Sequence, residues 1–233
     1  MESRSWFIDE LAHAGDEHLD AQYVRGYDQK AHFDPATDLA KLLELGLGPA
    51  SALIDFGAGT GEFSLAAAKV CQRVIAVDVS SAMLEAVRAK VREFSATNLA
   101  VVRGGFLSYE HVGEGVDFVY TRNALHRLPD FWKALALRRI ATLLKPGGIL
   151  RLRDLIFSFQ LDDTNRIVER WLNAAAVQPE SGWTRTELEV HLRDEHSTFT
   201  WLLEPMLERA GFEIRDITYD DLQVFAAYTC AKR

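Results

Sequence analysis

The sequence has few cysteines, no excess of basic residues and no long apolar run. Its 233 residues include two cysteines, Cys71 and Cys230, which stand far apart and in no metal-ligand spacing. This usage predicts two free thiols in a reducing compartment. The formal net charge of −8 argues against a nucleic-acid partner, which would select a basic stripe, although a local basic patch can lie within a negative total.

Two further absences bear on location. The opening residues "MESRSWFIDELAHAG" carry acids where a signal peptide would have a basic end followed by an apolar run. No apolar stretch reaches the roughly 20 residues that span a bilayer. We therefore expect a cytoplasmic protein with no membrane partner, present as a monomer or a homodimer.

Short apolar runs alternate with helical segments from Ala52 onward. The runs "ALIDF", "RVIAVD", "LAVVRG", "VDFVYT" and "ILRLRDLIF" predict five buried strands, because they are too short for helices. Strands that alternate with helices form a parallel sheet covered on both faces. A later helix is expected to end at "KPGG", and an earlier one places an apolar stripe on one face, made of Met83, Leu84, Val87, Val91 and Phe94.

The segments outside this alternation predict helices and a final hairpin. Two helices are expected first, at residues 5–14 and 34–45, joined by a polar connection, and residues 160–210 are expected to be helical. Only "DD" separates the last two strands, so they must pair antiparallel. We expect one domain over residues 1–233, with a helical lid (1–48), a cofactor-binding core (49–159), a helical substrate cap (160–210) and a strand pair (211–233).

The expected fold class is therefore α/β. It is a doubly wound, Rossmann-like and mostly parallel seven-stranded sheet with an antiparallel last strand, helices on both faces, and a helical insertion after the fifth strand.

The stretch "LIDFGAGTGEF" carries glycines at 57, 59 and 61 directly after the first strand. Such a loop lets a ligand approach the backbone at the carboxyl edge of the sheet, next to a helix N-terminus. The dinucleotide fingerprint has its third glycine one residue later, and Glu62 is a poor neighbour for a pyrophosphate. The loop favours a nucleoside with a different tail, which makes a nicotinamide-dependent oxidoreductase the less favoured alternative.

Two residues after the second strand suit the rest of a nucleoside. Asp78 closes that strand, and its carboxylate can accept from both ribose hydroxyls or, alternatively, cap the next helix. Met83, one helical turn further on, is placed to cover an adenine face.

Four motifs occur in the order and spacing of a known family. They are "LIDFGAGTGEFSLAAA", "VIAVDVSSAMLEAVRAK", "VDFVYTRNALHRLPD" and "LLKPGGILRLRD". They resemble the motifs of class I S-adenosylmethionine-dependent methyltransferases, nearest to the small-molecule branch that includes the ubiquinone-biosynthesis type. The resemblance covers about residues 50–155. It implies in-line attack on the sulfonium methyl of S-adenosylmethionine, with S-adenosylhomocysteine as the product.

The resemblance also implies roles for particular positions. Asp55 and the glycine loop would frame the methionine part, and Asp78 would hold the ribose. Tyr27 matches a lid tyrosine, and the segment near Asn123 would meet the methionine amino end. The implied cofactor-binding set is Tyr27, Asp55, Gly57, Ala58, Gly59, Gly61, Asp78, Val79, Met83, Gly105, Phe106, Asn123 and Leu125.

One departure from the family concerns the adenine. Many relatives carry an acid after the third strand that accepts from the adenine amino group, whereas this chain reads "RGGFL". Either the backbone makes that contact here, or the contact is missing.

Two residues are candidates for a general base, which is needed only if the acceptor arrives protonated. His126 follows the fourth strand, and its neutral imidazole can take a proton near pH 7. Asp154 lies on the fifth strand. Each has a structural alternative, since His126 can orient the loop or cover the cofactor, and Asp154 can cap a helix or pair with Arg153.

The acceptor pocket is expected to draw on the helical insertion. Its cluster "HLRDEHSTFTW" lacks H-E-x-x-H spacing, so no metal is expected, and a solvated helix end is the alternative reading. The candidate pocket residues are His32, Arg153, Phe157, His191, His196 and Trp201.

A small molecule is the favoured acceptor. The stretch "RNALH" is unlike the Asn-Pro-Pro-Tyr-like motif of amide N-methylation, and no cysteine ends the fourth or fifth strand for a pyrimidine C5 mechanism. Methyl transfer to RNA or protein, and non-catalytic cofactor binding, are the alternatives.

Overall fold

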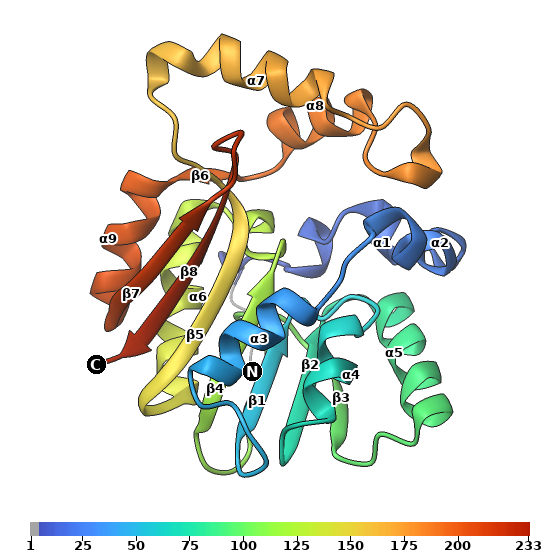
Figure 1. Ribbon diagram of the computed structural model, residues 1–233, viewed down its shortest axis with the longest axis vertical. Coiled ribbons are helices and arrows are strands. Elements are labelled where there is room, and N and C mark those ends of the chain that lie inside the picture. Colours follow the sequence, from blue (N-terminus) through green and yellow to red (C-terminus); the bar gives the residue numbers. More distant parts are fainter. Residues whose placement is uncertain (1–4) are drawn as a thin grey trace.

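A mixed sheet with the strand order β3-β2-β1-β4-β5-β8-β7 runs through the computed structural model, which describes residues 5–233 (Figure 1). The first five strands of this path pair in parallel, whereas β8 pairs antiparallel with both β5 and β7. The short β6 pairs with β5 off the main path. The expected Rossmann-like fold with an antiparallel last strand is confirmed. The strands are β1 Ala52–Phe56, β2 Arg73–Asp78, β3 Leu99–Arg103, β4 Val116–Arg122, β5 Leu144–Phe157, β6 Thr198–Phe199, β7 Phe212–Tyr219 and β8 Phe225–Lys232.

Helices cover both faces of the sheet. On one face, Leu42, Phe63 and Val87 join a buried apolar cluster from α3, α4 and α5, and on the other Leu137 and Leu207 do so from α6 and α9. The apolar stripes therefore face the sheet, as amphipathic helices require. The helices are α1 Asp16–Leu19, α2 Ala21–Ala31, α3 Ala36–Glu44, α4 Glu62–Ala68, α5 Ser81–Phe94, α6 Asp130–Leu143, α7 Thr164–Asn173, α8 Arg185–Asp194 and α9 Thr200–Ala210, with single 3-10 turns η1 Leu11–His13, η2 Leu125–Arg127, η3 Leu161–Asp163 and η4 Pro179–Ser181.

Of the two predicted N-terminal helices, the one at residues 34–45 corresponds to α3, whereas the one at residues 5–14 was wrong. Residues 5–14 contain only the turn η1, and the polar connection predicted after them contains α2. The Asp20 carboxylate caps α2 by accepting from the backbone N–H groups of Gln22 and Tyr23. This cap starts the helix despite its low apolar content. The first four residues of the predicted lid lie outside the described residues.

Two smaller predictions need correction. Phe94 was placed on the buried stripe of α5, but as the last residue of that helix it is 63% exposed. The "KPGG" stretch does follow α6, yet it belongs to β5 rather than to a separate turn. The pairing of β4 with β5 shifts register between Val116 and Phe118, which accommodates it.

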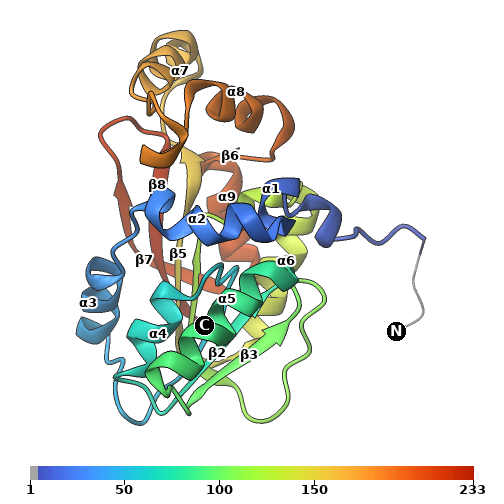
Figure 2. The same ribbon diagram turned by 90° about the vertical axis from the view of Figure 1, so that its right-hand side faces the viewer.

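The segment α1–α2 lies between the sheet and the α7–α8 pair in both views (Figures 1 and 2). It is fastened on both sides: α2 contacts α5 in the core and η4 near α8, and the Lys30 ammonium pairs with Glu187 of α8. Among the described residues, no helix combines the length and apolar character needed to cross a membrane.

Candidate functional site

The carboxyl ends of β1, β2 and β4 meet under the α1–α2 segment. The glycine loop turns there, and Gly57 has a positive φ of 68°. A Cβ on Gly57 would also collide with the Cβ of Ala124, in the loop after β4. Only glycine lets these two loops close together, because any other residue would be both strained and crowded.

A cavity opens at this edge and gathers nine of the thirteen predicted cofactor residues. These nine are Tyr27, Gly57, Gly59, Asp78, Val79, Met83, Gly105, Phe106 and Asn123. The remaining lining residues come partly from segments that no motif indicated, and they are Glu10, Ala14, His18, Ser80, Gly104, Arg122, Ala124, Arg127 and Leu128.

Asp78 presents its carboxylate to this cavity from the end of β2. Its Oδ2 accepts from the Gly59 N–H at 2.9 Å, and its Oδ1 accepts from the Ser80 N–H at 2.8 Å. Burial raises the pKa of Asp78 to about 6, although these backbone hydrogen bonds oppose the shift. The side chain that caps α5 is Ser80, whose hydroxyl accepts from the Met83 N–H. Asp78 is therefore free of the alternative N-cap role at this helix.

Four of the predicted cofactor residues do not line this cavity. Asp55 is buried under the loop, where it accepts from the Ser64 hydroxyl of α4 at 2.6 Å. Burial raises the pKa of Asp55 to about 7. Gly61 packs toward Val87, and Leu125 is fully buried. The fourth, Ala58, lines an adjoining depression together with Asp55.

No sequence motif indicated Glu10, which reaches the cavity from the N-terminal segment. Its Oε1 accepts from the Leu107 N–H at 3.0 Å, and its Oε2 accepts from the Ser108 N–H and hydroxyl at 2.9 and 2.7 Å. A Cβ on Gly105 would collide with this carboxylate. Glu10 therefore places an acid at the start of the loop after β3, where the residues "GGFL" include none.

The adjoining depression holds two of the predicted acceptor residues, His32 and Arg153. It shares Tyr27, Gly57, Gly59, Arg122 and Asn123 with the cavity, so the two spaces meet along the glycine loop. Trp183 of the insertion also lines the depression. The Trp183 ring contacts the Tyr27 ring edge-on at 6.5 Å. Burial raises the pKa of Tyr27 to about 12, which keeps its phenol protonated at neutral pH.

Both general-base candidates lie in a buried ion-pair cluster rather than on the cavity wall. Asp154 Oδ2 accepts from the backbone N–H groups of Leu125 and His126, and Asp154 Oδ1 pairs with His126 Nδ1. The other ring nitrogen, His126 Nε2, lies 3.1 Å from Glu195 Oε2. Burial alone would lower the pKa of His126, but Asp154 and Glu195 outweigh it and raise the pKa.

The other predicted acceptor residues are spread over the cap side. His191 belongs to the ion-pair cluster through Glu195. Phe157 packs in a separate aromatic cluster with Phe199, and His196 lies with its ring beside that of His13. Trp201 is 56% exposed. The structure brings none of these four side chains to the cavity or to the depression.

Comparisons with known proteins agree on the domain. Residues 53–148 match the family model for a methyltransferase domain. An uncharacterized methyltransferase of Oceanobacillus iheyensis is 24% identical over 148 residues, which is 64% of this chain and 63% of the relative. One from Geobacillus sp. is 28% identical over 138 residues, 58% of this chain and 62% of the relative. These alignments thus span less than two thirds of either relative.

Solved structures share the fold. Magnesium protoporphyrin IX methyltransferase from Synechocystis PCC 6803, with bound S-adenosylhomocysteine, superposes with a TM-score of 0.67 at 15% identity, covering 97% of this chain and 100% of that one. A SAM-dependent methyltransferase from Aquifex aeolicus gives 0.60 at 21% identity, covering 91% and 98%.

Proposed function

The chain belongs to the class I S-adenosylmethionine-dependent methyltransferases, and from this premise we propose that it transfers a methyl group from S-adenosylmethionine to a small-molecule acceptor. The single observation that carries the proposal is a cavity at the carboxyl edge, where the glycine loop, Asp78 and the Gly104–Phe106 segment meet. When bound there, the cofactor supplies a methyl group already activated by its sulfonium.

Different residues of the cavity contact different parts of the cofactor. Asp78 accepts from the ribose hydroxyls through the carboxylate that already holds Gly59 and Ser80. Met83 and Phe106 lie on the adenine, and Asn123 meets the methionine end. Asp55 does not contact the cofactor. It accepts a hydrogen bond from Ser64 and so holds α4 against the glycine loop, which positions the loop.

Glu10 supplies the acid that accepts from the adenine amino group. Its carboxylate lies against Gly105, in the loop where relatives carry an acid of their own. Leu107 and Ser108 fix it by backbone hydrogen bonds. Because a carboxylate offers about four lone-pair sites, Oε1 keeps capacity for one further donor.

The acceptor lies in the adjoining depression, which meets the cavity at Gly57, Gly59 and Asn123. Trp183 of the insertion and Tyr27 of α2 line it and contact each other. A depression between the core and the insertion suits a small molecule better than RNA or a folded protein. In this division of labour, residues 1–48 act as the lid, residues 49–159 with the 211–233 strand pair hold the cofactor, and residues 160–210 form the substrate cap.

His126 and Asp154 position the segment after β4 and do not abstract a proton. Their polar atoms are engaged with each other, with Glu195 and with the backbone of residues 125–126. Transfer then depends on an acceptor whose attacking atom needs no deprotonation by these two residues. We also propose a reducing, cytoplasmic setting, supported by two buried free thiols.

Calorimetric titration with S-adenosylhomocysteine, and with NADH in parallel, tests the cofactor. We expect micromolar binding of the first and none of the second, and the reverse result would replace the proposal by an oxidoreductase.

The acceptor class follows from incubating the protein with methyl-labelled S-adenosylmethionine and separated metabolite, RNA and protein pools. Label entering RNA or protein contradicts the small-molecule acceptor, and binding without transfer to any pool indicates a non-catalytic protein.

A further inference from the structure

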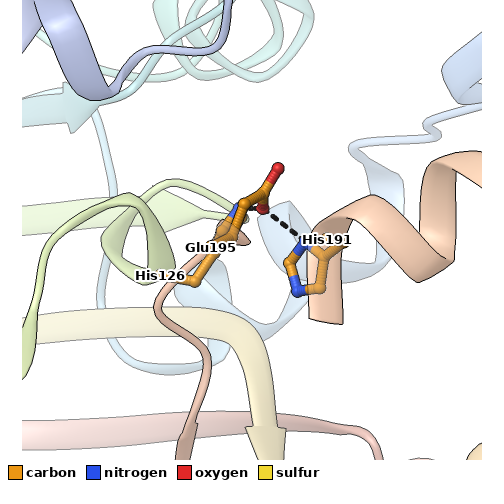
Figure 3. A group of neighbouring side chains, drawn as sticks. All are labelled: His126, His191 and Glu195. Carbon is orange, nitrogen blue, oxygen red and sulfur yellow. Dashed lines mark ion pairs between the residues drawn. The ribbon is translucent and has the colours of Figure 1, made fainter. Parts of the chain in front are cut away.

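Three side chains with metal-ligating atoms meet where the core touches the cap. His126 comes from η2 after β4, His191 from α8, and Glu195 from the residue that ends α8 (Figure 3). One ligand atom from each lies within 4.8 Å of the others. For comparison, the ligand atoms of a tetrahedral zinc site with bonds of 2.0–2.1 Å lie about 3.4 Å apart. The spacing is therefore close to that of a metal site.

The carboxylate at the centre of this cluster contacts both imidazole rings. Glu195 Oε2 lies 3.1 Å from His126 Nε2 and is the ion-pair partner of His191 Nδ1. Within the described residues, this buried oxygen nevertheless has no partner that meets hydrogen-bond geometry. A buried charged oxygen without a hydrogen bond is costly unless a cation compensates it.

In each of the three side chains, the polar atom that does not face the cluster centre has a partner of its own. Asp154 pairs with His126 Nδ1, Ser197 Oγ lies 2.7 Å from His191 Nε2, and Arg127 holds Glu195 Oε1 at 2.8 Å. This leaves His126 Nε2, His191 Nδ1 and Glu195 Oε2 facing one another. Carboxylate and hydroxyl groups that orient ligands from behind in this way are a general feature of metal sites.

We propose that His126 Nε2, His191 Nδ1 and Glu195 Oε2 bind one divalent first-row transition metal ion of the Zn²⁺ type. Two imidazoles and one carboxylate suit such ions, whereas Mg²⁺ and Ca²⁺ prefer oxygen ligands. No motif indicates the site, because His126 stands 65 residues before His191 in the chain. Three protein ligands leave a fourth position for water.

The ion would fasten the cap to the core beside the cofactor cavity. His126 belongs to the core, while His191 and Glu195 belong to the insertion. Arg127, which holds Glu195, also lines the cavity. The inference is independent of the proposed methyl transfer, since metal binding can be measured without any cofactor or acceptor.

The test is titration of the chelator-treated full chain with Zn²⁺. We expect one ion per chain with a dissociation constant on the order of 1 µM or tighter. Co²⁺ should bind at the same stoichiometry and give visible absorption bands that excess Zn²⁺ removes. Zn²⁺ should also raise the melting temperature, because a ligand that binds only the folded state stabilises it.

Three variants assign the binding to this cluster. His191→Ala and Glu195→Gln should each weaken Zn²⁺ binding by about 100-fold or more, and Ser197→Ala by about 10-fold through the orientation of His191. His111→Ala is the matched control, because His111 is bonded to Tyr109 and Glu114 away from the cluster, and it should bind as the wild type does. Far-UV circular dichroism checks that each variant is folded.

Two results would overturn the inference. The first is no saturable Zn²⁺ binding to the wild type, which would make the cluster an imidazolium–carboxylate ion-pair network only. The second is unchanged binding in folded His191→Ala and Glu195→Gln, which would place the ion elsewhere on the chain.

Discussion

Asp78 and Glu10 present carboxylates to one cavity from segments 68 positions apart in the chain. Asp78 follows a strand and is held by the loop beside it, whereas Glu10 precedes the turn η1 and is held by the loop after β3. Both carboxylates are fixed before any ligand arrives, so the cost of orienting them is not paid on binding.

Cofactor binding should weaken on acidification because of Asp78. Its pKa is raised to about 6, and ribose hydroxyls donate to the ionised carboxylate. A proton therefore competes with the ligand, and the affinity for S-adenosylhomocysteine should fall as the pH drops through about 6. In Asp78→Ala, affinity should be lower by about 1.5–3 kcal/mol at pH 8, the value of a charged hydrogen bond. Calorimetry between pH 5 and 8 measures both. A variant with wild-type affinity at pH 8 would remove Asp78 from the ribose site.

Glu10 should make the protein distinguish adenine from hypoxanthine. The wild type should bind S-adenosylhomocysteine about 10- to 100-fold more tightly than S-inosylhomocysteine, in which a carbonyl oxygen replaces the amino group and faces the carboxylate. Glu10→Ala should lose most of this preference, because it weakens binding of the adenine ligand and relieves the repulsion of the inosyl ligand. Ser108→Ala is the control, because it removes one internal partner of Glu10 and should keep the preference. Equal discrimination in wild type and Glu10→Ala would contradict the assignment.

At the scale of elements, a buried acid fastens α3 to the sheet. Asp38 accepts from the Tyr120 hydroxyl at 2.8 Å and pairs with Arg122 on β4 and with Arg151 on β5, each at 3.2 Å. Arg151 is itself buried and also bonds to Thr229 of β8. The Asp38 side chain thus joins α3 to β4 and β5, and Arg151 extends the network to β8.

Removing this acid should destabilise the protein strongly. Asp38→Ala leaves the Arg151 guanidinium buried without its carboxylate, which costs about 3–5 kcal/mol in comparable sites. Asp163→Ala removes an exposed pair with Arg166 and should change the free energy of unfolding by less than about 1 kcal/mol. Urea denaturation of both variants measures the difference. Similar small changes in the two would show that Asp38 does not fasten α3.

At the scale of the whole molecule, α2 lies between the cofactor cavity and the cap. Its Tyr27 lines the cavity and contacts Trp183 of the cap, and its Lys30 pairs with Glu187. We therefore expect release of a ligand from the cavity to involve movement of α2 or the cap. Contacts between them should slow that release.

Lys30→Ala should consequently speed dissociation of S-adenosylhomocysteine several-fold while changing its association rate less, as most contact losses do. Stopped-flow measurement of tryptophan fluorescence reports the rates, since Trp183 lies beside the lid. Arg185→Ala is the matched control, because Arg185 pairs with Glu169 and Glu189 within the cap. If both variants release the ligand at the wild-type rate, the Lys30 contact does not hold the lid.

Local patterns in the sequence were sufficient to predict the sheet, the glycine loop and the position of Asp78. Strands β1 to β5 and helices α3 to α6 follow from the apolar periodicity of short segments, and the loop from glycines at positions where a Cβ would collide or strain the backbone. Each of these features depends on residues close together in the chain, so the local pattern is sufficient to predict it.

The packing of distant segments determines which further side chains complete the site, and no local pattern predicted them. Glu10 joins the loop after β3 across about 97 positions, and His126 meets Glu195 across about 69, counted along the printed sequence. The fold also places His126 and Asp154 in a buried ion-pair cluster and not on the cavity wall, where they were predicted. Such contacts arise from how the lid, the core and the cap pack together, and no local periodicity carries that information.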